Sequence, residues 1–170
     1  MNLEFAINRL QHNLDVIRSM VAGVADGQAR WKPNAESWSI LEVINHYYDE
    51  EREDFRQRID YMLHRPDEDW PPIDPAGWVT ARKYNERDLA ESLANFSAER
   101  LNSLKWLPQL AEADWQMARP TPWRASLSAG DLLASWVAHD HLHIRQLNEL
   151  HYAYIVKQME PYGVGYAGEW

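Results

Sequence analysis

The chain has 170 residues, a net charge of −9 at neutral pH and no cysteine. This length suits one domain with its own hydrophobic core, and we predict that residues 1–170 form that domain. The excess of acidic residues disfavours nucleic-acid binding, because phosphate backbones are negatively charged. Without cysteine there are no disulfides, thiolate zinc sites or cysteine nucleophiles, so a bound metal must rely on imidazole, carboxylate or water ligands.

The N-terminal residues do not resemble a secretory signal, and no stretch is apolar over the length that a membrane span needs. We therefore expect a soluble, cytoplasmic protein with no membrane partner. The chain also has nine tryptophans, and those in predicted loops either cover a pocket or seal the ends of a helical bundle. We favour the second interpretation, because aromatic rings contribute strongly to buried cores. The loop tryptophans are Trp31, Trp38, Trp70, Trp78, Trp115 and Trp123.

Four segments with helical periodicity predict an all-α, four-helix bundle with long loops that carry proline and tryptophan. The first segment covers about residues 3–24, where apolar residues recur every three or four positions. The second begins after Ser39, whose pairing with Glu42 indicates a capping box, and it runs to about Leu63. Pro66 then ends it, since proline cannot continue a helix.

The third predicted helix begins somewhere in the range 80–88 and ends before Pro108. The fourth begins after Ser128, with Asp131 as its capping partner, and continues to about Tyr154. No β-strand is predicted, because no segment alternates apolar and polar residues between hairpin turns.

Two histidines in the fourth helix, His139 and His143, are four residues apart. Residues at this spacing lie one above the other on a helix, so both imidazoles can approach one metal ion. His141, between them, points the opposite way. A chain with seven histidines can acquire such a pair by chance, and the pair therefore needs a third ligand from another helix.

His46, two turns into the second helix, is the best candidate for that third ligand. Glu50 follows it by about one turn and has three interpretations: a fourth ligand, an acceptor for an imidazole N–H, or a general base. The remaining histidines are poorer candidates. His12 lies on the polar side of the first helix, His64 at a helix end, and His151 at the wrong angle from the pair.

The segments 38–46 (WSILEVINH) and 139–146 (HDHLHIRQ) resemble the DinB-like (DinB/YfiT) superfamily of metalloenzymes. The resemblance covers nearly the whole chain in length and in helix order. Each segment has histidines where the family has its metal ligands. The resemblance therefore implies three ligands and a glutamine that follows the last of them: His46, His139, His143 and Gln146.

The same resemblance implies a four-helix bundle with an unusual connection order, a zinc or nickel ion, and assembly into a homodimer. Some relatives transfer low-molecular-weight thiols or isomerise thiol adducts, so the implied partner is a small-molecule substrate, for example a thiol. Tyr47 and Tyr48 depart from the family pattern, which has a small aliphatic residue after the histidine. The wall of the pocket is therefore expected to differ.

Three functional hypotheses remain open. In the first, three imidazoles hold a divalent ion with an open position, in a metal-dependent transferase or hydrolase-like enzyme with Glu50 as the base. In the second, the protein is a non-catalytic module that binds a metal or small ligand. In the third, the histidines are only hydrogen-bonded in the core of a scaffold. A di-iron site is excluded, because Asp140 and His143 form the only acid-x-x-His pair.

Overall fold

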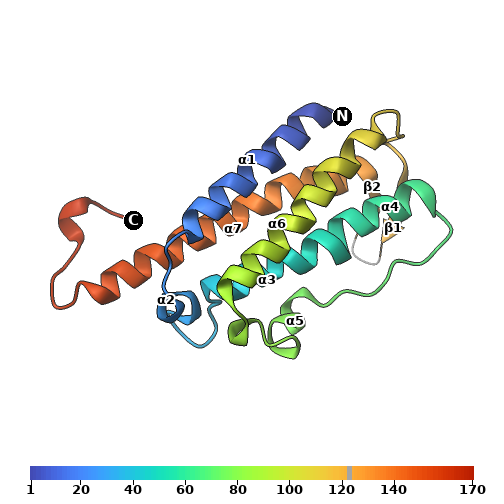
Figure 1. Ribbon diagram of the computed structural model, residues 1–170. Helices are drawn as coiled ribbons and strands as arrows, with labels where there is room; N and C mark the ends of the chain where they lie inside the picture. Colours follow the sequence, from blue (N-terminus) through green and yellow to red (C-terminus); the bar gives the residue numbers. More distant parts are fainter. Residues whose placement is uncertain (122–123) are drawn as a thin grey trace.

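The computed structural model describes residues 1–121 and 124–170. Its main body is a four-helix bundle, as predicted (Figure 1). The second bundle helix is continuous but contains one π-helical turn. The bundle helices are α1 (Leu3–Val21), α3 (Ile40–Glu50) with the π turn (Glu51–Phe55) and α4 (Arg56–His64), α6 (Leu89–Trp106), and α7 (Ala129–Gln158).

Shorter helices lie in the connections, where the sequence predicted only loops. Helix α1 ends at Val21, about three residues before the predicted end of the first helix. Helix α7 ends at Gln158, four residues after the predicted Tyr154. The short helices are α2 (Asp26–Arg30), α5 (Pro75–Ala81), and single 3₁₀ turns at Tyr84–Glu86, Leu107–Leu110 and Gly165–Ala167.

The prediction that the chain has no strand is wrong. Strands β1 (Ala118–Thr121) and β2 (Arg124–Ser128) form an antiparallel pair before α7. Leu127 is the buried residue of this pair. The hairpin therefore lacks the apolar alternation by which a half-buried strand is recognised in a sequence. Pro122 and Trp123, two of the predicted loop residues, lie outside the described residues.

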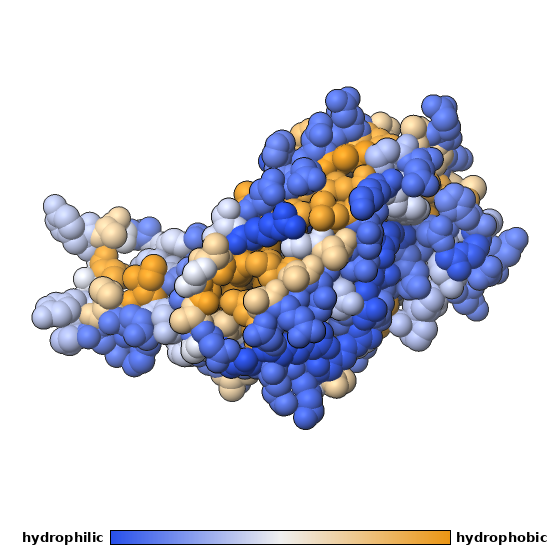
Figure 2. All heavy atoms as spheres, in the orientation of Figure 1, coloured by the Kyte–Doolittle hydropathy of each residue, from blue (hydrophilic) through white to orange (hydrophobic). Residues whose placement is uncertain are grey.

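The bundle helices do not pack in sequence order. Helix α1 contacts α6 and α7, and α3 contacts the same two helices. The first and second bundle helices therefore lie on opposite corners. The C-terminal end of α7 extends beyond the other helices (Figure 1). Figure 2 shows a largely hydrophilic face with separate hydrophobic patches. None of the helices in the described chain combines the length and apolar character that a membrane crossing requires.

Both predicted capping boxes are confirmed. The Ser39 hydroxyl accepts from the Glu42 amide at 3.1 Å, and the Glu42 carboxylate accepts from the Ser39 amide at 2.8 Å. Ser128 and Asp131 make the same reciprocal pair at the start of α7. Each box satisfies amides that a helix start leaves free, and so it determines where the helix begins.

The core consists of two apolar clusters with a polar layer between them. One cluster surrounds Trp136 and Phe55, and the other surrounds Tyr47 and Phe96. Between them lies a hydrogen-bonded group of four buried polar residues, one from each bundle helix. These residues, which we call the polar layer, are Asn13, Glu51, Arg100 and Asp140.

Candidate metal centre

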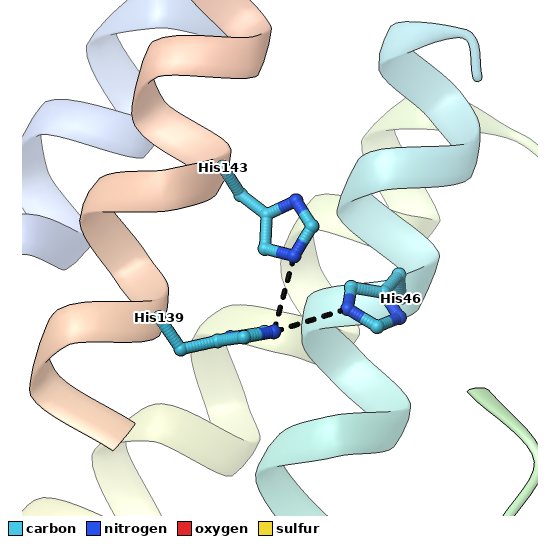
Figure 3. Close-up of side chains that lie close together, drawn as sticks. All are labelled: His46, His139 and His143. Atoms are coloured by element: carbon cyan, nitrogen blue, oxygen red, sulfur yellow. Dashed lines mark hydrogen bonds between the residues drawn. The ribbon is translucent and has the colours of Figure 1, made fainter. Parts of the chain in front are cut away.

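The three histidines predicted as ligands come together beside the polar layer. His46 projects from α3, and His139 and His143 project from successive turns of α7 (Figure 3). The Nε2 atom of His139 lies 3.3 Å from Nε2 of His46 and 3.1 Å from Nε2 of His143. One ring nitrogen from each histidine lies within 4.8 Å of the other two. Helix packing thus brings together residues 93 positions apart in the chain.

These separations suit a tetrahedral metal ion. Two nitrogen ligands at about 2.0–2.1 Å from a tetrahedral zinc ion are themselves about 3.3–3.4 Å apart. Because the two Nε2 pairs are already 3.1 and 3.3 Å apart, the imidazoles need little movement to share one ion. Nitrogen donors of this kind bind zinc, nickel and other divalent first-row metals. The residues therefore fit the ion that the family resemblance implies.

Burial keeps the imidazoles in the form that binds a metal. Burial, followed by the neighbouring His143 and His139, lowers the pKa of His46 to about 2. Burial, followed by His143, lowers the pKa of His139 to about 3. Burial also lowers the pKa of His143, against the hydrogen bond to Gln146. All three rings are therefore neutral at physiological pH, as imidazole ligands must be.

Gln146 fixes the orientation of one ring. Its Oε1 atom lies 2.7 Å from Nδ1 of His143. A glutamine oxygen can only accept a hydrogen bond, so Nδ1 of His143 carries the proton and its Nε2 presents a lone pair. The Nδ1 atom of His46 is buried and has no hydrogen-bond partner among the described residues.

Aromatic side chains surround the histidines. The Trp38 ring lies 4.9 Å from the His46 ring and is nearly parallel to the His143 ring at 6.1 Å. On the inner side, the Tyr47 ring lies 5.3 Å from His143, and the Phe55 ring lies 5.1 Å from His139. Trp38 thus covers the centre, whereas Trp70 and Trp115 pack against the core cluster around Trp136. Trp38 thus agrees with the interpretation that loop tryptophans cover a pocket, and Trp70 and Trp115 contribute to the buried core.

An open groove of about 470 Å³ reaches the centre from the surface. It is lined by His143 and Gln146 from α7 and by Trp38 from the segment before α3. Leu150 adds an apolar contact, and Glu36 and Glu149 add carboxylates. A groove of this size accommodates a small organic molecule next to His143.

Glu50 is buried on α3 but does not belong to the group of potential metal ligands. Burial, followed by the charge of Asp54, raises the pKa of Glu50 to about 9. Its Oε1 atom has no hydrogen-bond partner among the described residues. Asp54 in turn pairs with Arg58 at 2.6 Å. Glu50 therefore carries a proton at neutral pH.

The other histidines lie away from the centre. His12 and His141 are exposed, and His64 contacts Asp60 near the end of α4. His151 lies 3.0 Å from the Gln28 side chain, between α2 and α7.

The polar layer was not predicted from the sequence, although one residue in α6 indicated it. Arg100 stands four residues after Phe96 and four before Leu104 on the apolar stripe of α6. A charged residue at such a position is buried only when it is paired.

Two comparisons identify the family and the fold. The family model for the DinB superfamily matches residues 9–147. None of the curated proteins matches the sequence. One similar solved structure is YfiT from Bacillus subtilis, described as a probable metal-dependent hydrolase with an unusual four-helix bundle topology. It is 19% identical, with a TM-score of 0.77 over 92% of this chain and 87% of that one. The chain described above belongs to the DinB superfamily.

Proposed function

We propose that the protein binds one divalent ion, zinc or nickel, through Nε2 of His46, His139 and His143. We further propose that it uses this centre in a hydrolase- or transferase-type reaction on a small molecule. The observation that carries the proposal is the convergence of three neutral imidazoles at 3.1 and 3.3 Å. The description of YfiT as a probable metal-dependent hydrolase agrees with it.

A divalent ion held by three imidazoles acts as a Lewis acid and makes a water or thiol placed beside it more acidic. The residues around the histidines prepare the site for such chemistry. Gln146 holds the His143 ring in one tautomer. Trp38, Tyr47 and Phe55 limit the access of water, which strengthens electrostatic interactions inside the site.

Glu50 is the proposed acid–base residue. It stands one helical turn from His46, on the same helix. Since its pKa is raised to about 9, it holds a proton at neutral pH. This state suits donation of a proton to a leaving group, and a general-base role requires that the proton is first lost.

The proposed substrate is a small molecule that enters the groove between Trp38 and His143. A thiol is one suitable class, because thiolates are good ligands for zinc and nickel, and the chain has no cysteine of its own. The cytoplasmic location and the homodimer stay predictions of the sequence.

Metal analysis of purified protein tests the centre. We expect about one ion per chain in the wild type and loss of that ion in His143→Ala, because two imidazoles rarely retain a divalent ion through purification. His141→Ala is the matched control, since His141 is exposed on the same helix and should not affect metal content. Stoichiometric metal in a variant that lacks all three histidines would refute the site.

The proposed catalytic activity is tested by measuring turnover of esters, amides and thiol adducts by the metal-loaded protein. Glu50→Gln should keep the metal and lose about 100-fold or more in turnover. The exposed Glu112→Gln is the control. A metal-loaded wild type that turns over none of these compounds would instead support the non-catalytic binding module.

A further inference from the structure

The polar layer lies directly behind the three histidines. Asp140 follows His139 in α7, and Tyr47 follows His46 in α3. The Tyr47 hydroxyl donates to the backbone carbonyl of Asp140 at 2.8 Å, and its ring lies edge-on to His139 at 6.3 Å. A single aromatic side chain therefore connects the layer to the candidate metal centre.

Arg100 is the hub of the polar layer. Its two terminal nitrogens each donate to one oxygen of Asp140 at 2.8 Å, and its Nε donates to Glu51 at 2.8 Å. Asn13 donates to Asp140 at 3.0 Å, and the Trp136 indole donates to Glu51 at 3.0 Å. Every carboxylate oxygen in the layer thus accepts a hydrogen bond.

The layer carries more negative than positive charge. The two carboxylates of Glu51 and Asp140 pair with the single guanidinium of Arg100, which leaves a formal net charge of −1. All three side chains are only 1% exposed. A buried ionic group rarely stabilises a fold more than apolar residues of the same volume would, and an excess buried charge is costly. A cation nearby would reduce that cost.

We propose that the polar layer supplies a fixed negative charge that offsets the divalent ion at the three histidines, with Asp140 as the principal positioning residue. The inference rests on the metal site proposed above. It explains why a bundle core keeps an ion group beside these histidines in place of apolar side chains. The layer acts through space, since Asp140 directly follows His139 in α7, and it does not bind the metal itself.

Three variants separate charge from packing. Asp140→Asn removes the charge with little change of shape and should weaken Co²⁺ and Zn²⁺ binding by about 10–100-fold. Glu51→Gln should also weaken metal binding, but by less than Asp140→Asn. Glu51 follows His46 by more than one helical turn, whereas Asp140 directly follows His139. Arg100→Lys disturbs the bidentate geometry but keeps the charge, so its metal affinity should stay within about three-fold of the wild type. Affinities are measured by competition with a chromophoric chelator, and the Co²⁺ absorption spectrum reports the coordination geometry.

The stability of each metal-free variant is measured in parallel by urea unfolding. If the layer is only structural, metal affinity will follow stability, and Arg100→Lys will lose as much affinity as Asp140→Asn; that result overturns the proposal. Wild-type affinity in Asp140→Asn also overturns it. The ratio of the wild-type and Asp140→Asn affinities should change little with added salt, because buried charges are poorly screened.

Failure of the metal site itself would look different. In that case the wild type would bind no Co²⁺, or His143→Ala would bind it equally well. If only the present inference fails, the wild type will still bind Co²⁺ and His143→Ala will still fail to bind it.

Discussion

The imidazoles of His46 and His139 are held in environments where their charged forms are unfavourable. Their pKa values fall to about 2 and about 3 because burial removes the water that would stabilise an imidazolium. In the unfolded chain the same groups bind protons near pH 6.5. Between pH 6.5 and about 3 the unfolded state therefore binds more protons than the folded state.

Consequently, the metal-free protein should lose stability as the pH falls through this window. Each fully shifted histidine contributes up to about 1.4 kcal/mol per pH unit. Glu50 acts in the opposite sense: its pKa is raised to about 9, so the stability that its protonated form contributes is lost as the pH rises from about 4.5 to 9. The two effects are separated by replacing one residue at a time.

For His46→Asn we expect that about 2 kcal/mol of the wild-type loss between pH 7 and pH 5 disappears. Urea unfolding in the presence of a chelator measures this, and His12→Asn, at an exposed position of α1, is the matched control. An identical pH dependence in the wild type and in His46→Asn would contradict the prediction.

At the scale of single elements, the π turn accounts for the way the second bundle helix follows the core. Its buried residues Tyr47, Glu51, Phe55 and Ile59 are spaced four apart. In a regular α-helix each step of four residues rotates a side chain by about 40° relative to the previous one. Three such steps would turn Ile59 away from the core. The π turn at Glu51–Phe55 takes up the extra residue and keeps all four side chains on one face.

Deleting Arg52, a half-exposed residue inside the π turn, should convert this turn to regular α-helix. The residues on both sides would keep their faces, so we expect a loss of roughly 1–3 kcal/mol in the free energy of unfolding and retention of metal binding. Deleting Gln57 in α4 is the control. It rotates Ile59 and everything after it by about 100° and should cost more than about 4 kcal/mol. Equal losses for the two deletions, measured by urea unfolding, would show that the π turn does not have this role.

At the scale of the whole molecule, the candidate metal centre links two helices that are already held by the core. Helices α3 and α7 contact each other, and both contact α6 or its neighbour α1. Apolar clusters lie on both sides of the polar layer. The bundle therefore has enough buried apolar surface to fold without the ion, unlike small domains that depend on a structural metal.

Metal removal should accordingly lower the melting temperature without unfolding the protein at 25 °C. A free ion at 100 times its Kd stabilises by about 2.7 kcal/mol, which corresponds to roughly 5–10 °C for a chain of this size. Circular dichroism with and without a chelator measures the shift. The double variant His139→Ala/His143→Ala should melt at the same temperature in both conditions. Loss of the helical signal on chelation at 25 °C would contradict this view.

Local signals in the sequence determined much of this protein. The helix starts at Ser39 and Ser128 follow from capping boxes, which involve residues only three apart. The four-residue spacing of His139 and His143 makes them neighbours on any helix. Four amphipathic stripes are enough to predict a bundle. The position of His46 in the second helix made it the candidate third histidine, and the family resemblance added Gln146; the structure brings His46 to the pair and Gln146 to His143.

Only the tertiary structure decided which distant residues meet, because their contacts depend on how the helices pack. It placed His46 against His139, paired Arg100 with Glu51 and Asp140, and left Glu50 protonated outside the ligand group. A charged residue on an apolar stripe does not by itself reveal its partner, since the partner lies on another helix. The strand pair of residues 118–121 and 124–128 was missed for a related reason: it is held by pairing between backbones, which leaves little trace in the side chains.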